Sequence, residues 1–324
     1  MEDGSDDRLS VVIAFRQEGD EIARTVESIQ KTTPNGKVDV ILVDDNSEDD
    51  YDYGKVADSL GCRYIKLYKT LGPSGARGVG VRAAETENVV IMDGHMRFYD
   101  DRWNERVCRH LKDNQNAILC SGTTSVKDGL EDDKKNDFGA YILFEGTPGE
   151  EYYPKWSPEN DYIDQDNKEL SRVPCVLGAF YAFTKNHWNK IGGLEGLSGY
   201  GFDEPYMSLK SWLFGGECLV MKDFYVGHLY REKSTAGSSS VDFYANQIFM
   251  VNTFTEDADK RANALKNIRE IAGVDMYLRA RDRYNKRHTK VFLAQDFIKK
   301  NRNAEAEKEF LKLNDLMKNG FSGR

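Results

Sequence analysis

Two short segments, far apart in the chain, carry the side chains with the clearest chemistry. The segment VVIMDGH supplies Asp93 and His95, and the segment MKDFYVGHLYR supplies His228. One carboxylate and two imidazoles can bind a divalent cation such as Mn²⁺ or Mg²⁺ and leave coordination positions open for a diphosphate. Gly94, between the first two, lets the backbone bend close to such an ion. We interpret the three residues as candidate metal ligands; alone, the same types also suit a surface aspartate and hydrogen-bonded histidines.

A second acidic feature, Asp44 and Asp45, follows the hydrophobic run at residues 38–43. Carboxylates at this place suit the hydroxyls of a ribose or the N–H of a uracil. They also suit a turn or the N-cap of the helix that follows. Both residues are therefore candidates for nucleotide binding, with a structural role as the alternative.

The elements that must position these side chains alternate along the first part of the chain. Hydrophobic runs that predict strands lie at residues 9–15, 38–43, 62–67, 88–92 and 117–121. Stretches that predict helices lie between them, at residues 20–31, 51–60, 74–84 and 101–113. Such alternation favours an α/β fold with a mostly parallel sheet and right-handed crossovers. Asp93 follows the fourth run, and strand ends are where an open sheet of this kind binds its ligands.

The second part of the chain has a weaker pattern. Residues 125–172 are rich in charges, glycines and aromatics and predict an excursion over the surface. An apolar stretch at 173–184, broken by Gly178, and a helix at 204–214 follow, and residues after about 241 are helical in pattern, with an amphipathic helix at 304–318. We therefore predict one large α/β domain over residues 1–240 and a helical C-terminal extension over residues 241–324.

Composition excludes several classes of protein. The 324 residues are 40% hydrophobic, yet no apolar run approaches the roughly 20 residues of a membrane-spanning helix. The acidic, polar start of the chain is unlike a secretory signal, and five cysteines without CxxC spacing predict buried thiols. We therefore expect a cytoplasmic protein. A net charge of −9 argues against a strongly basic nucleic-acid surface, although basic stretches at 279–283 and 286–290 could contact phosphates or simply be solvated helix faces.

Six motifs in one order carry a family resemblance that spans residues 9–231. The stretches SVVIAFRQEGDEIARTVESI, VDVILVDDNSEDD and GPSGARGVGVRAAETENVVIMDGH resemble the nucleotide-binding half of GT-A glycosyltransferases of the family-two type. In particular, they resemble the polypeptide N-acetylgalactosaminyltransferases, with their F-H-N-E, R-T-V, I-L-V-D-D and D-S-H motifs. Downstream, VLGAFYAFTK, GYGFDEPYMSLKSWLFGG and VGHLYR resemble the G-G-L-F, W-G-G-E-N…S-F-R-x-W-x-x-G-G and V-G-H-V-F-R motifs.

The resemblance implies a GT-A fold with a nucleotide-binding half at about 9–124 and an acceptor half at about 125–240. It implies that Asp93, His95 and His228 bind the metal ion, with Gly94 in place of the family's serine. Donor-binding roles are implied for Ala14, Phe15, Glu18, Asp44, Asp45, Arg77, Gly94 and Arg231. Phe15 and Glu18 would lie beside the uridine, Asp44 or Asp45 would bind its base or ribose, and Arg77 would face the diphosphate or the sugar. Arg231 would brace its own segment or a phosphate.

The chain departs from the family where the motif has Glu-Asn, because here the pair is Asp203-Glu204. In an inverting mechanism Glu204 would be the candidate base that takes the proton of the acceptor hydroxyl. In a retaining mechanism either acid would orient the acceptor or the sugar. The alternative is helix capping, with Asp203 as N-cap and Glu204 in the first turn. His110, His187 and His288 lie outside the motifs, and we expect them to be structural.

The resemblance therefore predicts a metal-dependent glycosyltransferase that uses a UDP-sugar and a hydroxyl acceptor. The acceptor hydroxyl could belong to a protein Ser or Thr, a glycan or a hydroxymethylated base in DNA. The family's membrane anchor and lectin domain are not found in the chain, which agrees with the cytoplasmic expectation. Residues 232–240 could close over the donor as a lid or could be an ordinary loop. Two alternatives are a catalytically silent sugar-nucleotide or glycan-binding module and a nucleotidyltransferase, whose glycine-rich phosphate loop is missing near the start.

Overall fold

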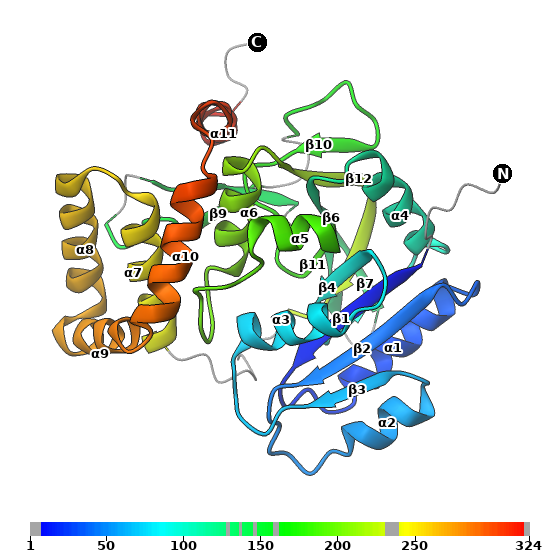
Figure 1. Ribbon diagram of the computed structural model, residues 1–324. Coiled ribbons are helices and arrows are strands. Elements are labelled where there is room, and N and C mark those ends of the chain that lie inside the picture. Colours follow the sequence, from blue (N-terminus) through cyan, green and yellow to red (C-terminus); the bar gives the residue numbers. More distant parts are fainter. Residues whose placement is uncertain are drawn as a thin grey trace.

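A ten-stranded mixed sheet with helices on both faces forms the body of the molecule (Figure 1). The computed structural model describes residues 8–127, 130–135, 138–144, 148–157, 162–230 and 240–320, and statements about the fold refer to these. The main path of the sheet runs β10-β12-β6-β11-β4-β1-β2-β3, with β5 paired to β12 and β7 paired to β6. The expected α/β fold with a mostly parallel sheet is confirmed, and the core lies on both faces of that sheet.

The predicted strand and helix alternation is present in the first part of the chain. The parallel strands are β1 (Leu9–Phe15), β2 (Val38–Asp44), β3 (Arg63–Lys66) and β4 (Asn88–Met92). The helices between and after them are α1 (Glu21–Thr32), α2 (Tyr53–Ser59), α3 (Pro73–Ala83) and α4 (Trp103–Asp113). Because β1 lies between β2 and β4, the ends of these strands meet at one edge of the sheet.

The second part of the chain adds an antiparallel strand to the same sheet. It contributes β6 (Ala117–Lys127), β11 (Phe180–Thr184), α5 (Lys185–Ile191), α6 (Asp203–Leu213) and β12 (Glu217–His228). Strand β11 runs antiparallel to both β4 and β6, whereas β12 runs parallel to β6. The two-residue strand β5 (Met96–Arg97) pairs antiparallel with the end of β12, so His228 lies opposite Met96.

The predicted surface excursion at 125–172 was wrong in part, because the segment contains short strands. These are β7 (Leu130–Lys135), β8 (Gly139–Ile142), β9 (Pro154–Ser157) and β10 (Leu170–Arg172). Phe138, Ala140 and Ile142 are fully or almost fully buried. Strands of three to six residues have no long apolar run, and pairing with neighbours supplies the backbone hydrogen bonds that periodicity does not reveal.

The side chains of each strand alternate between two hydrophobic layers, as the period of two requires. On one face, Val12 and Ile91 pack with α3 and α6. On the other face, Ile13 and Met92 pack with α1, α2 and α4, including the fully buried Trp103. Both faces of the central strands are therefore dry, and the open edge at the strand ends is left for ligands.

The C-terminal helices share one of these layers. They are α7 (Ser240–Phe254), α8 (Ala258–Ala272), α9 (Val274–Asn285), α10 (His288–Asn301) and α11 (Ala304–Lys318). Phe249 of α7 and Phe310 of α11 are buried in the layer that contains α6. Asn314 of α11 bonds the backbone N–H and C=O of Ile142 at 2.7 and 2.9 Å, and so covers an edge of β8.

Two expectations from composition can be compared with the fold. No helix in the described part of the chain has the length and apolarity that a membrane crossing needs. The cysteines are all free thiols, and four of them, Cys108, Cys120, Cys175 and Cys218, are buried, whereas Cys62 is half-buried.

A close backbone crossing connects the start of α3 with the loop that precedes α6. Gly72 has φ 77° and ψ 170°, and a Cβ atom there would lie only 2.3 Å from Cα of Gly199. Gly273, before α9, has nearly the same backbone at φ 79° and ψ 154°, but a Cβ atom there would meet nothing within 4 Å. Substitutions at these two glycines therefore distinguish the effect of a steric clash on stability from the effect of backbone strain alone.

We expect Gly72→Ala to destabilise the protein more than Gly273→Ala. Each change imposes about 1–3 kcal/mol of backbone strain, and only Gly72→Ala adds a clash that pushes two loops apart. Urea unfolding of both variants measures the difference, which should be at least about 2 kcal/mol, on the scale of overpacking. Equal losses of stability would contradict the close crossing.

Candidate active site

A cavity of about 510 Å³ opens at the ends of β1, β4 and β12. Side chains that line it come from both parts of the sheet and from the loops above them. Of the residues that the sequence singled out, the lining includes Ala14, Phe15, Glu18, Asp45, Arg77, Asp93, Gly94, His95, Asp203, Glu204 and His228. The strand ends therefore carry a site, as expected for an open α/β sheet.

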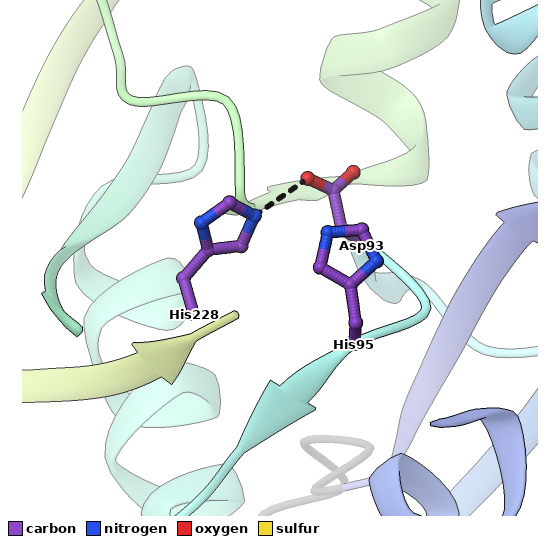
Figure 2. A group of neighbouring side chains, drawn as sticks. All are labelled: Asp93, His95 and His228. Carbon is purple, nitrogen blue, oxygen red and sulfur yellow. Dashed lines mark ion pairs between the residues drawn. The ribbon is translucent and has the colours of Figure 1, made fainter. Parts of the chain in front are cut away.

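Asp93, His95 and His228 form one cluster in this cavity (Figure 2). Asp93 follows β4, His95 precedes β5, and the pairing of β5 with β12 places His228 against the turn. The backbone N–H of Leu229 donates to the C=O of His95 at 3.1 Å, and the two imidazole centroids are 4.9 Å apart. One ligand atom from each residue can be chosen so that all three lie within 4.8 Å of one another. A single cation can reach a set of atoms this compact.

Two nitrogen atoms of the cluster that could bind a metal ion make no hydrogen bond to the described residues. Both ring nitrogens of His228 are buried and make no hydrogen bond to the described residues, and Nε2 faces Oδ2 of Asp93 at 3.4 Å. Nδ1 of His95 lies 3.2 Å from Oε2 of Glu18. Burial raises the pKa of Asp93, but His228 and Arg77 outweigh it, so the net pKa lies well below the usual range. An ionised carboxylate beside a buried imidazole whose nitrogens make no hydrogen bond in the described part of the chain fits a divalent cation.

Arg77 of α3 links this cluster to the start of α6. Its Nη1 donates to Oδ2 of Asp203 at 2.8 Å, and its Nη2 donates to Oδ1 of Asp93 at 3.1 Å. The guanidinium lies 5.8 Å from the ring centroid of Tyr181, and its side chain is only 10% exposed. Ser74 donates to the other oxygen of Asp203 at 2.7 Å. Both Asp203 oxygens are therefore occupied.

Asp203 and Glu204 have different surroundings although they are neighbours. Phe202, with φ 70°, occupies the N-cap of α6, so the alternative of Asp203 as N-cap was wrong by one residue. Glu204 lies 3.9 Å from Nη1 of Arg77, beyond hydrogen-bond distance. Burial, together with the adjacent Asp203, raises the pKa of Glu204 to about 7. Its carboxylate contacts Gly178, where a Cβ atom would lie 2.3 Å from Oε1.

The two acids after β2 have fixed partners. Asp45 accepts from the backbone N–H groups of Leu71 and Gly72 at 2.7 and 2.8 Å and borders the cavity. Asp44 is fully buried, accepts from Tyr64 Oη at 2.7 Å and from the N–H of Ser47 at 2.7 Å, and is not among the described cavity residues. The structure therefore shows the turn-stabilising contacts that were the alternative for this pair.

Phe15 and Gly94 line the cavity close to each other. Phe15 packs against Tyr53, with ring centroids 4.7 Å apart. A Cβ atom at Gly94 would lie 2.8 Å from Cδ1 of Ile22 and 3.3 Å from Cγ of Glu18, so a larger residue would displace the wall beside His95. Arg231 lies outside the described residues, as does the proposed lid up to 239.

Two of the three histidines outside the motifs, His110 and His187, are buried in the fold. His187 is fully buried, its Nε2 lies 2.9 Å from Oγ of Ser211, and burial lowers its pKa to about 4. His110 is also buried, and burial lowers its pKa. His288 begins α10 and is not a cavity residue.

Sequence reasoning missed a set of aromatic residues around the cavity. They are Tyr153, Trp156, Tyr200, Tyr230 and Phe243. Each stands in or next to a polar segment and belongs to a different local pattern, so no spacing groups them. Tyr200 and Tyr230 stand inside the quoted motifs GYGFDEPYMSLKSWLFGG and VGHLYR, but the resemblance assigned these rings no role. Arg16, which also lines the cavity and donates to Glu48 at 3.1 Å, was likewise missed.

Comparisons with known proteins agree with the geometry. The family model described as "Glycosyl transferase family 2" matches residues 10–187. The chain is 25% identical over 232 residues to polypeptide N-acetylgalactosaminyltransferase 13 of Rattus norvegicus, which covers 69% of this chain and 41% of that protein. It is 26% identical over 237 residues to polypeptide N-acetylgalactosaminyltransferase 3 of Mus musculus, over 69% of this chain and 37% of that one. The chain thus spans about two fifths of the length of these relatives.

Two solved structures share the fold. A crystal structure of GalNAc-T7 with UDP, GalNAc and Mn²⁺ is similar at a TM-score of 0.64 and 21% identity, over 82% of this chain and 54% of that one. A crystal structure of S. aureus TarS 1–349 in complex with UDP-GlcNAc is similar at a TM-score of 0.57 and 15% identity, over 81% of this chain and 71% of that one. The fold is therefore shared with proteins crystallised with UDP or with UDP-GlcNAc.

Arg77 forms a buried bridge between Asp203 and Asp93, and we expect this bridge to contribute more to stability than an exposed ion pair does. Asp203→Asn removes the best partner of a buried guanidinium, and we expect a loss of about 2–4 kcal/mol in unfolding free energy, somewhat reduced because Asp93 and Glu204 remain beside it. The matched control is Asp282→Asn, whose exposed pair with Lys286 should contribute about 0–1 kcal/mol. Urea unfolding measures both; similar small losses would mean that the bridge does not hold the two halves together.

Proposed function

The chain belongs to glycosyl transferase family 2, and on that premise we propose that it transfers a sugar from a UDP-sugar to an acceptor hydroxyl with the help of a divalent cation. The observation that carries the proposal is the cluster of Asp93, His95 and His228 beside the buried Arg77. Similarity to GalNAc-T7 crystallised with UDP and Mn²⁺, and to TarS with UDP-GlcNAc, supports the choice of donor.

The donor set of the cluster suits a cation that also binds phosphate oxygens. Asp93, His95 and His228 would hold Mn²⁺ or Mg²⁺, and three protein ligands leave positions for a diphosphate. The bound ion would supply neutralisation of the charge that develops on the leaving diphosphate. Two observations support this assignment: the ring nitrogens of His228 make no hydrogen bond to the described residues, and His95 has a second contact, to Glu18, that can orient its ring.

The floor of the cavity would bind the nucleotide. Phe15 and Ala14, at the end of β1, and Glu18 after it lie where a uridine would meet the strand ends. Asp45 would border the ribose while it holds the backbone of the loop before α3. Asp44, turned toward Tyr64, would act by shaping this turn. Arg77 would donate to the diphosphate or the sugar, since its cationic charge is already directed to the same end of the cavity.

Glu204 is the candidate proton acceptor in this site. In the proposed step the acceptor oxygen forms a bond to the anomeric carbon and gives its proton to the Glu204 carboxylate. The bond from the anomeric carbon to the diphosphate oxygen breaks, and its electron pair leaves with UDP. Displacement with a base on the acceptor side inverts the anomeric configuration. Asp203 is not the base, because Ser74 and Arg77 occupy both of its oxygens.

Metal binding provides a test that is independent of turnover. When Mn²⁺ is titrated into the protein, we expect the EPR signal of the free ion to disappear as the ion binds. Asp93→Asn and His228→Ala should each weaken Mn²⁺ binding at least about tenfold, because each removes a ligand. Both should also abolish Mn²⁺-dependent release of UDP from a panel of UDP-sugars. His288→Ala is the matched control and should bind Mn²⁺ like the parent protein. Equal Mn²⁺ affinity in all four proteins would rule out the cluster as the metal site.

The pKa of Glu204 predicts the pH dependence of the reaction. The base must be deprotonated, so with a pKa of about 7 kcat should rise about tenfold per pH unit below that value and level off above it. Glu204→Gln should lower kcat by about 10²–10⁴-fold and remove this rise, while binding of UDP and Mn²⁺ persists. ¹H NMR of the product should show an inverted anomeric configuration. A retained configuration, or an unchanged pH profile in the variant, would exclude Glu204 as base.

A further inference from the structure

Four aromatic side chains that line the cavity are partly exposed to water. Tyr153, Trp156, Tyr200 and Tyr230 line it and are 37, 36, 45 and 49% exposed. We call these four residues the aromatic rim. Large apolar rings left in contact with water around one cavity indicate a surface that a ligand covers.

The rim is held by the fold. The side chain of Asn246, fully buried in α7, donates to the C=O groups of Ser198, Tyr200 and Gly201 at 2.9, 3.3 and 3.0 Å, which fixes the loop that carries Tyr200. Tyr153 precedes β9, and its ring lies 6.3 Å from that of Phe243. Trp156 lies within β9. Tyr153 and Trp156 are thus carried by the β8–β9 pair, and Tyr200 is carried by a loop that Asn246 holds.

Tyr230 joins the rim to the metal cluster. Its ring stands edge-on to that of His228 with centroids 4.3 Å apart, and its Oη lies 2.8 Å from Oγ1 of Thr123. Glu204 lines the same cavity, and its charge is one of the causes, after burial, that raise the pKa of Tyr200. A molecule that covers the rim therefore lies in one cavity with the proposed base and the metal cluster, which is where an acceptor belongs.

The charge of the cavity disfavours an acceptor with phosphates. Among the described lining residues, five are carboxylates, Glu18, Asp45, Asp93, Asp203 and Glu204, and two are guanidinium groups, Arg16 and Arg77. A divalent cation and a diphosphate would roughly cancel each other, so this excess of negative charge would remain. Lys155, next to the rim, is paired with Glu150 at 2.8 Å. Acidic walls with exposed rings suit a neutral ligand with C–H faces and many hydroxyls.

We propose that the aromatic rim is an acceptor subsite for a neutral saccharide. The apolar face of a pyranose ring stacks on Tyr200 or Trp156, and the carboxylate of Glu204 accepts the hydrogen bond of the hydroxyl that reacts. This inference rests on the proposed function and names its substrate class. Peptides and nucleic acids are the competing acceptors, and they would need backbone hydrogen bonds or cationic side chains at the rim.

The distribution of tryptophans gives a direct test. Trp156 is 36% exposed, whereas Trp103, Trp188 and Trp212 are 0, 7 and 8% exposed. Quenching of tryptophan fluorescence by acrylamide will therefore report mainly on Trp156. With UDP and Mn²⁺ present, maltotriose, cellotriose and N,N′,N″-triacetylchitotriose are titrated as neutral probes, next to a serine-containing peptide and a single-stranded oligonucleotide.

At least one trisaccharide should reduce the quenching, and Tyr200→Ala should weaken its binding about fivefold, the loss of one ring stack. Tyr68→Ala, which removes an 89% exposed ring that does not line the cavity, should leave the binding unchanged. Protection by none of the trisaccharides overturns the proposal, as does protection only by the peptide or the oligonucleotide. Binding of UDP and Mn²⁺, measured separately by calorimetry, shows whether such a failure extends to the proposed function or concerns the acceptor alone.

Discussion

The site depends on one buried cation, the guanidinium of Arg77. It connects Asp93, which follows the central strand β4, with Asp203, which begins α6 in the other half of the chain. A buried charge is costly unless it is paired, so the two carboxylates and the arginine hold one another in place. The same contacts fix the orientation of the Asp93 carboxylate. They leave Glu204, unlike its neighbour Asp203, without a hydrogen bond to Arg77. They also bring the proposed donor and acceptor sides into one cavity.

Two further constraints complete the geometry. The pairing of β5 with β12 places His228 beside His95, although the two lie far apart in the sequence. Glycines lie where other groups approach the backbone closely. The Glu204 carboxylate contacts Gly178, and the loop that carries Tyr200 contacts Gly72. The proposed acceptor subsite therefore depends on the same crossing of loops that joins the start of α3 to the segment before α6.

Much of the fold and part of the site could be predicted from the sequence, because hydrophobic runs and strand ends are local features. The strands β1 and β4 and the helix α11 have the predicted bounds. Asp93 and His95 lie within three residues of the end of β4, so the prediction of that strand also placed them. Strands β7 to β10 could not be predicted, since their pairing partners supply what their short sequences lack. The partners of Asp44 and Asp203, and the grouping of the rim, arise from tertiary contacts that no spacing in the chain encodes.

The proposed reaction requires that Asp93, His95 and His228 bind one cation at the end of the sheet. The most direct measurement is anomalous X-ray diffraction at the manganese edge from crystals grown with Mn²⁺ and UDP. We expect one strong peak within bonding distance of all three side chains, about 2.0–2.2 Å from their oxygen and nitrogen atoms, with diphosphate oxygens as its other ligands. A bound UDP with no peak at the cluster, or a peak bound elsewhere, would contradict it.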